Sequence, residues 1–337
     1  MRVLLTGIGG SIGCHVFAHI MHNTSWEVVG IDSFRHKGLT DRVEQMLSAH
    51  SDWRARLEVF THDLTAPISF HLFKKIGNID YIINLASLSD VNASLEQPAA
   101  FIMNNVQVMT TMLDYARLVS PLVFLQMSTD EVYGPTNGLT SHKEWDAIVP
   151  SNPYSASKAA QEAIAIAYWR SYGVPLIIVN TMNNFGEMQS PAKFPAMVQR
   201  KVSIGEQVTV HGSQDHPGTR FYIHSRNTAD ALLFLLKNVP PDKHTPGMVD
   251  RPSRYNVVGD KQLSNLELAR TIARLMNCGL QYTMNDFHAT NPGHDYHYGL
   301  DGAKLAARGW VSPTTFMWSM RHTIEWQQEH SDWLNPG

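Results

Sequence analysis

Residues 2–13 read Arg-Val-Leu-Leu-Thr-Gly-Ile-Gly-Gly-Ser-Ile-Gly, and this stretch decides the predicted fold. Its apolar start is typical of a short buried strand, and a helical pattern follows its last glycine. The spacing of Gly7, Gly10 and Gly13 allows a tight turn that brings backbone amides to a pyrophosphate at a helix N-terminus. The strand–turn–helix context supports a dinucleotide-binding loop, which a glycine triplet alone would not. We expect its cofactor-binding residues to be Gly7, Gly10, Ser11, Ile12 and Gly13.

An acidic residue ends the next predicted strand, residues 26–31. Asp32 lies about 20 residues beyond the glycines, where a carboxylate suits the ribose hydroxyls of NAD and repels a 2′-phosphate. Arg35 and Lys37 nearby weaken the preference for NAD over NADP. A structural role for Asp32, as a cap of the following segment, is the alternative.

The third and fourth predicted strands, residues 57–61 and 81–86, add further cofactor contacts. Asp63 is placed to meet an adenine amine, although it could equally be a turn residue. A long helix is predicted from Gln97 to Val119. We expect these segments to contribute the cofactor-binding residues Asp63, Leu64, Leu85, Ala86, Ser87 and Asn104, and the crevice residue Ser89.

Catalytic candidates follow the fifth predicted strand, residues 122–125. The segment Met127 to Gly134 reads Met-Ser-Thr-Asp-Glu-Val-Tyr-Gly and should lie at the carboxyl end of that strand, where open α/β sheets place their ligands. Asp130 and Glu131 form an acid/base pair there, beside Thr129. The alternative is that these carboxylates belong to a solvated loop.

A helix predicted from Pro153 to Tyr172 carries a second pair. Tyr154 and Lys158 are four residues apart and share one face of the helix. The lysine charge favours phenolate, so we expect a lowered pKa for Tyr154, which would let it take a proton from a sugar or alcohol hydroxyl. Both residues are also predicted to contact the cofactor. Tyr-x-x-x-Lys alone is common by chance, and the neighbouring motifs make the functional interpretation the stronger one.

The alternation of strands and helices over about 180 residues predicts an α/β fold, a Rossmann-type doubly wound parallel sheet with a smaller C-terminal substrate-binding domain. We expect residues 1–180 to form the NAD-binding domain, with segments near 210–258 returning to it. Residues 181–337 should mainly bind the substrate, which the family resemblance described below implies is a nucleotide sugar. Within them, Arg220 and Asn256 are candidates for a diphosphate and a ribose, although each could be an ordinary surface residue.

Bulk properties exclude several classes of protein. The 337 residues are 43% hydrophobic and 17% charged, with a net charge of −3 and no basic stripe that would favour nucleic acid. Cys14 and Cys278 are far apart and have no metal-type spacing, so we predict no metal site. We see no signal peptide and no apolar run long enough for a membrane span, and we therefore expect a cytoplasmic protein with no membrane partner.

Together these motifs resemble the extended short-chain dehydrogenase/reductase family over nearly the whole chain. Within it, Ser128 to Gly134 is similar to the signature of dTDP-glucose 4,6-dehydratases. The segments Asn183 to Gly186 and Pro292 to Asp295 match further motifs of that group. The resemblance implies the substrate-binding residues Ser89, Asn183, Asn184, Lys193, Arg220, Asn256 and His294, and a homodimer packed through the helices 97–119 and 153–172.

The resemblance also implies a reaction. Tyr154 would deprotonate the sugar O4 while NAD takes the C4 hydride, and Thr129 would hold that oxygen. Glu131 would remove the C5 proton and Asp130 would protonate the departing O6 hydroxyl, so that hydride returns to C6 and NAD is regenerated. Lys158 completes the predicted catalytic set.

The chain departs from the group's usual pattern at several positions. Leu88, Asp90, Asn92 and Ala93 replace the usual crevice residues, and Asn291 replaces an arginine. These changes leave the nucleotide and the sugar open, with dTDP-glucose as the default and a UDP-sugar as the rival. A 4-epimerase or a decarboxylase on the same fold is the alternative enzyme, and a non-catalytic NAD-binding protein is the alternative outside catalysis.

Overall fold

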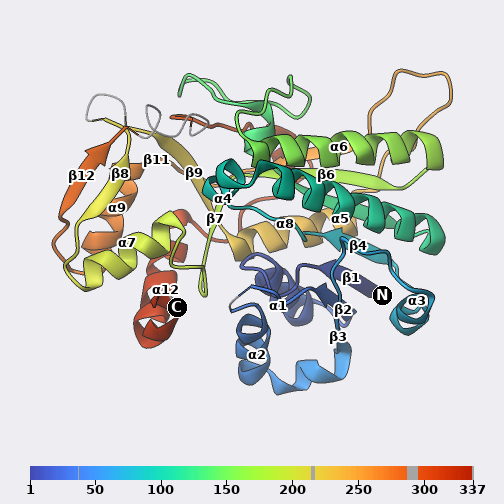
Figure 1. The fold of residues 1–337 in the computed structure, drawn as a ribbon, viewed down its shortest axis with the longest axis horizontal. Coiled ribbons are helices and arrows are strands. Elements are labelled where there is room, and N and C mark those ends of the chain that lie inside the picture. Colours follow the sequence, from blue (N-terminus) through green and yellow to red (C-terminus); the bar gives the residue numbers. More distant parts are fainter. Residues whose placement is uncertain (37, 214–216, 287–294, 336–337) are drawn as a thin grey trace.

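A parallel seven-stranded sheet forms the centre of the molecule, with the strand order β10-β6-β5-β4-β1-β2-β3 (Figure 1). The structure is a computed structural model that describes residues 1–36, 38–213, 217–286 and 295–335. The strands of this sheet are β1 (Arg2–Thr6), β2 (Glu27–Asp32), β3 (Leu57–Thr61), β4 (Tyr81–Asn84), β5 (Val123–Thr129), β6 (Leu176–Thr181) and β10 (Ser253–Val257).

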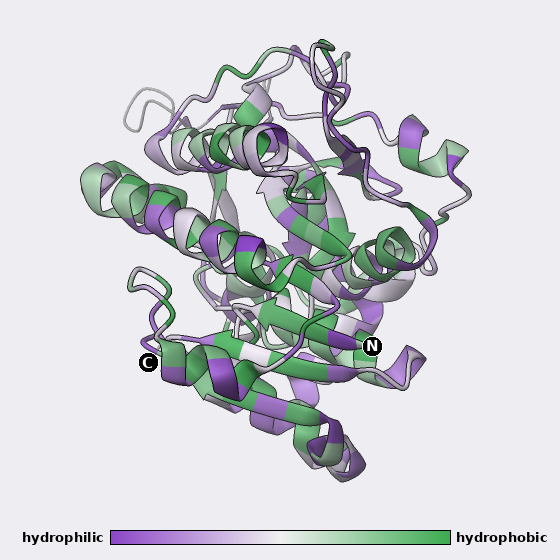
Figure 2. Cartoon of the chain, turned by 90° about the vertical axis from the view of Figure 1, so that its right-hand side faces the viewer, coloured by the Kyte–Doolittle hydropathy of each residue, from purple (hydrophilic) through white to green (hydrophobic). Residues whose placement is uncertain are grey.

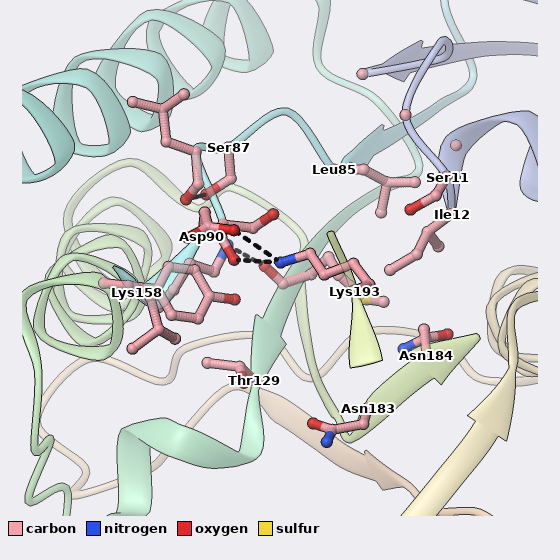
Figure 3. Close-up of a pocket in the computed structure, with 18 of the residues that line it drawn as sticks. Ser11, Ile12, Leu85, Ser87, Asp90, Thr129, Lys158, Asn183, Asn184 and Lys193 are labelled. Carbon is pink, nitrogen blue, oxygen red and sulfur yellow. Dashed lines mark hydrogen bonds and ion pairs between the residues drawn. The ribbon is translucent and has the colours of Figure 1, made fainter. Parts of the chain in front are cut away.

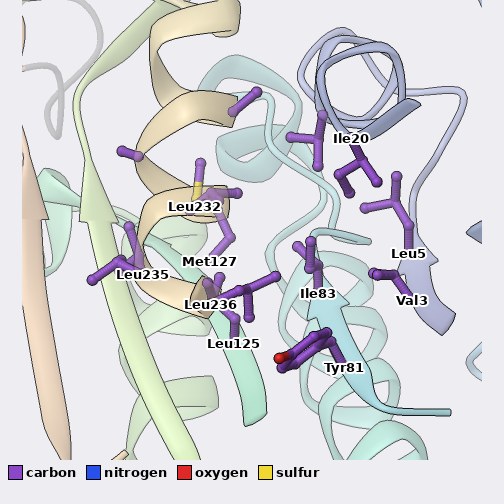
Figure 4. Packing of buried hydrophobic residues seen from close by; sticks show 14 of the residues in the cluster. Val3, Leu5, Ile20, Tyr81, Ile83, Leu125, Met127, Leu232, Leu235 and Leu236 are labelled. Atoms are coloured by element: carbon purple, nitrogen blue, oxygen red, sulfur yellow. The ribbon is translucent and has the colours of Figure 1, made fainter. Parts of the chain in front are cut away.

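Helices cover both faces of this sheet, because alternate residues of each strand point to opposite sides. Val3 and Leu5 face α1 (Gly13–Asn23) and α8 (Ser225–Asn238) in one apolar cluster, which Figure 4 shows from close by. The cluster is continuous from β1 to β5 and onto Leu232 and Leu235 of α8. The helix that begins at the glycine-rich loop is therefore fixed to the sheet by its own apolar face.

The opposite face of the sheet packs against α5 (Pro98–Val119) and α6 (Pro153–Tyr172). Leu4 of β1 lies in this second cluster with Met109 and Met112 of α5, both fully buried. Figure 2 shows the apolar strands enclosed between helices whose outer residues are hydrophilic. Met109 and Met112 therefore belong to the core of the chain and are not available to a dimer contact through α5.

The remaining helices connect these layers and build the smaller lobe. They are α2 (Leu39–Ala49), η1 (Ser51–Arg56), α3 (Phe70–Ile76), α4 (Val91–Glu96), η2 (Asp130–Tyr133), α7 (Phe194–Ser203), α9 (Asn265–Leu275), α11 (Ala303–Ala307), α12 (Phe316–Glu329) and η3 (Ser331–Leu334). No helix in the described part of the chain combines the length and apolar character that a membrane span needs.

Two small sheets form the rest of the smaller lobe, on the left of Figure 1. One joins β7 (Asn183–Phe185), β9 (Thr219–His224) and β11 (Gln262–Ser264), and the other joins β8 (Val208–His211) to β12 (Tyr282–Asn285). They pack against α7, α9 and α12 in a separate apolar cluster. Of the segments near 210–258, β10 and α8 therefore return to the main sheet, while β8 and β9 do not.

The predicted strands and helices agree with the structure, with shifts at their ends. β1, β3 and α6 have the predicted bounds, and Ser264 with Glu267 forms the predicted capping box of α9. β5 runs on to Thr129 instead of ending at Leu125. Thr129 is thus the last residue of a strand that is paired to β6 through Thr181, which fixes its backbone more firmly than a loop would.

Candidate active site

A cavity of about 550 Å³ opens at the carboxyl ends of the main strands. It lies where the strand order reverses, between β1 and β4, which is the ligand position of open α/β sheets. Both lobes contribute to its wall, and Figure 3 shows the side chains that meet there. The predicted cofactor residues that line it are Gly7, Gly10, Ser11, Ile12, Gly13, Asp32, Asp63, Leu64, Leu85, Ala86, Ser87, Asn104, Tyr154 and Lys158.

The glycine-rich loop forms a close-packed turn at the start of α1. Gly7 has a positive φ of 71°, and an added Cβ at Gly13 would come within 2.0 Å of the Gly7 carbonyl oxygen. Any side chain at position 13 would therefore break the turn. Because glycines occupy these positions at a helix N-terminus, the backbone amides can approach the pyrophosphate of a dinucleotide closely, so these residues fit NAD.

The end of β2 carries the predicted ribose contact. The Asp32 carboxylate is buried and accepts hydrogen bonds from the amides of Gly9 (3.0 Å) and Phe34 (3.1 Å). Asp32 therefore stabilises the loop and also lines the cavity, so its structural role is compatible with the predicted ribose contact. Farther along, Arg35 donates to both Asp63 (2.9 Å) and Asn104 (2.6 Å), which brings two of the predicted cofactor-binding residues together.

Thr129, Asp130 and Glu131 lie where β5 passes into η2. Thr129 caps η2 by accepting the Glu131 amide at 3.3 Å, and its hydroxyl donates to the Asp130 carboxylate at 2.9 Å. Thr129 and Glu131 line the cavity, while Asp130 lies just behind its wall and is 2% exposed. The carboxylates do not belong to a solvated loop.

The two carboxyl groups have different surroundings. Burial raises the pKa of Asp130 to about 7, and the neighbouring Glu131 adds to the rise. One of its carboxyl oxygens has no hydrogen-bond partner in the described residues. Burial also raises the pKa of Glu131, but a 2.9 Å hydrogen bond from the Asn152 side chain opposes that shift. Asp130 can therefore hold a proton near neutral pH, as an acid must.

Tyr154 and Lys158 both face the cavity from α6, but they interact less directly than the sequence predicted. Burial raises the pKa of Tyr154, with Glu131 as the next cause, so the expected lowering by Lys158 is wrong for this structure. Burial of the phenol is the largest cause of this rise, and the ammonium of Lys158 donates to the Met127 carbonyl (2.8 Å) and to Gln161 (2.7 Å). Burial lowers the pKa of Lys158 to about 8.

The smaller lobe brings the predicted substrate residues Asn183, Asn184, Lys193 and Arg220 to the same cavity, and Ser89 lines it from the segment that follows β4 of the main sheet. The Lys193 ammonium reaches across it to Asp90 (3.5 Å) and to the Ser89 carbonyl (3.4 Å), as Figure 3 shows. Asn184 is held by a 2.6 Å bond from Thr228, so its orientation is fixed. Two cations, Lys193 and Arg220, thus lie on the substrate side.

Asn256 does not reach the cavity, and its predicted contact with a ribose is not supported. Its side chain is 0% exposed and donates to the carbonyls of His142 and Asp301, both at 3.1 Å. It joins three segments of the chain because β10 places it within the main sheet. His294 and Asn291 lie outside the described residues.

Sequence reasoning missed Tyr298, which lines the cavity, and Asn152, which contacts Glu131 without lining the cavity. Asn152 caps α6 and holds Glu131, which its position before Pro153 could have indicated. Tyr298 lines the cavity, donates to Asp295 at 2.5 Å and lies under Arg220. No periodicity marks Tyr298, since its place depends on a loop. Among the residues that the structure describes, no group of three or more possible ligands could hold a metal ion.

Comparisons with known proteins agree with this geometry. The model of the NAD dependent epimerase/dehydratase family matches residues 3–257. The dTDP-glucose 4,6-dehydratase of Salmonella typhimurium strain LT2 is 30% identical over 99% of this chain and 95% of that protein. The structure of DesIV, a dTDP-glucose 4,6-dehydratase from Streptomyces venezuelae with NAD bound, has a TM-score of 0.86 and 25% identity, covering 100% of this chain and 99% of that one.

The fold is also shared with epimerases. The structure of the UDP-glucose 4-epimerase from Thermus thermophilus in complex with NAD has a TM-score of 0.83 at 22% identity. It covers 97% of this chain and 99% of that one. At this identity the likeness concerns the fold, so the choice between reactions rests on the side chains of the site.

Proposed function

We propose a function from one premise, which is that the chain belongs to the NAD dependent epimerase/dehydratase family. It is a nucleotide-sugar 4,6-dehydratase that converts an NDP-hexose, with dTDP-glucose as the default, to the 4-keto-6-deoxy sugar nucleotide. Full-length similarity to dTDP-glucose 4,6-dehydratases supports this choice. The observation that carries it is the pair Asp130 and Glu131, with one carboxyl group poised as an acid and its neighbour held by an amide.

When bound, NAD supplies the acceptor for the C4 hydride and later the donor of a hydride to C6, and a proton returned to C5 completes that reduction. The loop from Gly7 to Gly13 would hold the pyrophosphate of NAD, because its glycines leave the backbone amides accessible at the helix N-terminus. The carboxylate of Asp32 would accept hydrogen bonds from the ribose hydroxyls. The structure of DesIV, which this chain resembles in fold, has NAD bound.

In the first step, Tyr154 takes the proton from the sugar O4 and Thr129 holds that oxygen. Both side chains line the cavity beside each other, and a hydrogen bond with the Thr129 hydroxyl lowers the pKa of Tyr154 against the effect of burial. Lys158 contributes a positive charge from the next turn of α6. A positively charged ligand beside Tyr154 would lower the pKa of Tyr154 further, and the oxidised nicotinamide ring of NAD would carry such a charge.

In the second step, a water molecule is eliminated across C5 and C6. The new ketone at C4 makes the C5 proton acidic, and Glu131 removes it as the base. Asp130 gives its proton to the departing O6 hydroxyl, since burial keeps that carboxyl protonated up to about pH 7. Two carboxyl groups in unlike surroundings can thus take opposite roles.

The substrate side supports a diphosphate ligand. Lys193 and Arg220 supply two positive charges, and Asp90 forms an ion pair with Lys193. A diphosphate that enters the cavity would replace Asp90 as the ion-pair partner of Lys193, and it carries two negative charges. The carboxylate at position 90 is one of the departures from the usual pattern, so it bears on which sugar is accepted.

A homodimer is the proposed assembly, packed through the outer faces of α5 and α6. Ile102 and Met103 of α5 are exposed, with 66% of Met103 open to solvent. Exposed apolar side chains on two neighbouring helices favour burial against a second copy. Light scattering on the purified protein tests this, and a monomer at all concentrations would contradict it.

The function is tested by mass spectrometry of the protein incubated separately with dTDP-glucose, UDP-glucose and UDP-N-acetylglucosamine. Loss of one water from one substrate is the expected result, and it names the nucleotide sugar as well. An unchanged mass with an inverted C4 centre in the NMR spectrum would show a 4-epimerase. Release of carbon dioxide from a UDP-uronic acid would show a decarboxylase, and either result would replace the dehydratase.

A further inference from the structure

Lys158 is held by two neutral oxygen atoms and leaves one N–H for the cavity. Its side chain is 4% exposed, and the ammonium donates to the Met127 carbonyl at 2.8 Å and to Oε1 of Gln161 at 2.7 Å. A buried ammonium needs such acceptors, because burial without them costs several kcal/mol or displaces the proton. The two bonds also fix where the third N–H points.

The amide of Gln161 has only one orientation that satisfies its surroundings. Its Nε2 donates to the Asn105 carbonyl at 2.7 Å, and its Oε1 accepts from Lys158 and from Gln126 (3.2 Å). If the amide were reversed, its NH₂ group would face the donors of Lys158 and Gln126, and its oxygen would face the carbonyl oxygen of Asn105. Gln161 is 0% exposed and is absent from the cavity wall, so it acts only through its neighbours.

A chain of buried side chains connects Gln161 to the cofactor side. Gln126 accepts from Asn84 at 2.7 Å, and Asn84 accepts from the Thr6 hydroxyl at 2.7 Å. Thr6 in turn accepts from the amides of Leu85 and Ala86, both at 3.1 Å. The chain crosses the adjacent strands β5, β4 and β1 and ends directly before the glycine-rich loop. Every donor along it has an acceptor.

We propose that Gln161 is a positioning residue for Lys158, and that the chain through Gln126, Asn84 and Thr6 holds it in register with the cofactor loop. Its effect on the rate rests on the proposed function, whereas its effect on cofactor binding does not. Lys158 keeps one fixed N–H for a group in the cavity. A dinucleotide bound along the loop therefore meets an ammonium that is already oriented.

The test replaces Gln161 with Met, which keeps the volume and removes the acceptor. We expect the affinity for NAD, measured by calorimetry, to fall about tenfold, and kcat to fall about ten- to a hundredfold, as for a lost hydrogen bond to a charged group. KM for the sugar nucleotide should change little, because Gln161 does not line the cavity. The more conservative Gln161→Glu keeps an acceptor for Lys158 and should restore most of kcat.

Two further variants separate positioning from stability. Gln126→Met breaks the chain but leaves Lys158 both acceptors, so it should lower the melting temperature at least as much as Gln161→Met and lower kcat less. Gln327→Met is the matched control. Gln327 is a buried glutamine of α12 whose side-chain atoms have no partner in the described residues, and its replacement should change neither NAD affinity nor kcat.

The proposal is overturned if Gln161→Met binds NAD and turns over like the wild type. It is also overturned if the losses of NAD affinity and kcat in Gln161→Met, Gln126→Met and Gln327→Met simply follow the fall in their melting temperatures. Should the Met variant not fold, Gln161→Asn keeps the amide, withdraws its oxygen from Lys158, and carries the same expectations. Wild-type protein that binds NAD but transforms no sugar nucleotide would end the proposed function alone. The NAD affinities of the variants would still decide the role of Gln161.

Discussion

The two walls of the cavity differ in how the chain builds them. The wall from the main sheet combines residues that directly follow the buried parallel strands β1, β2, β4 and β5 with Tyr154 and Lys158 of α6, which packs on that sheet. The wall from the smaller lobe consists of residues such as Lys193, Arg220 and Tyr298, which depend on short strands and on contacts between distant segments. We infer that the first wall sets the chemistry and the second sets the substrate.

The largest effect is expected on the first wall, from Tyr154→Phe. Loss of the hydroxyl that takes the O4 proton should slow oxidation at C4 by about 10²- to 10⁴-fold. Formation of NADH in a single turnover with dTDP-glucose measures this step. Tyr168→Phe is the matched control, because Tyr168 lies on the same helix and its hydroxyl donates to Asp114 at the surface, away from the cavity. Equal rates for the two variants would remove Tyr154 from the reaction.

Asp130→Asn should separate the two chemical steps. The amide cannot give a proton to the leaving hydroxyl, so formation of the dehydrated product should fall by about 10²- to 10³-fold. Oxidation at C4 should continue, and NADH should accumulate during the reaction. A variant that dehydrates at the wild-type rate would show that Asp130 is not the acid.

The wild-type pH profile gives an independent check of the same carboxyl group. Its pKa is raised to about 7, so the protonated acid is present below that pH and is lost as the pH rises through it. Dehydration should therefore decline above pH 7, approaching about tenfold per pH unit, if proton transfer limits the rate. Asp130→Asn should lack this decline, and a profile that rises from pH 7 to 9 would contradict the assignment.

On the second wall, Lys193→Met should act on binding. Removing a cation from the diphosphate side should raise KM for the sugar nucleotide about tenfold, equivalent to about 1.4 kcal/mol, and leave NAD affinity unchanged. Lys201→Met is the matched control, since Lys201 lies on α7, which Lys193 precedes, and donates to the Gln207 carbonyl at the surface, away from the cavity. A loss of kcat without a change of KM would move Lys193 to the chemical wall.

The smallest effect on activity is expected from Asn256→Ala. The side chain joins buried segments, so its loss should lower the free energy of unfolding by about 1–3 kcal/mol, as for unpaired buried groups. KM should stay within about twofold of the wild type, because the side chain does not face the cavity. Denaturant unfolding and steady-state kinetics measure the two quantities. A large rise in KM with unchanged stability would return Asn256 to the substrate site.

The same contrast explains what the sequence could predict. The glycine-rich loop, the carboxyl ends of the strands and the Tyr154 helix follow from local patterns, since strand, turn and helix signals lie within a few residues of each other. Asn256 was misassigned because a polar residue on a strand looks the same in the sequence whether its strand joins a sheet or borders a cavity. Tyr298 was missed because a long-range contact with Arg220 places it.

The pKa of Tyr154 shows a second limit of local reasoning. The four-residue spacing correctly puts Tyr154 and Lys158 on one face of α6, and both line the cavity. The ammonium of Lys158, however, donates hydrogen bonds to Met127 and Gln161, and neither acceptor can be inferred from the spacing. Burial and Glu131 then decide the direction of the shift.

The most direct test of the account follows the hydrogen atom from C4. dTDP-glucose carrying deuterium at C4 is incubated with the protein, and the product is analysed by mass spectrometry and NMR. We predict a product that has lost one water and carries the deuterium at C6, since the hydride that leaves C4 returns to that carbon. Deuterium retained at C4 with no loss of water, with or without inversion at that carbon, would contradict the proposed dehydratase.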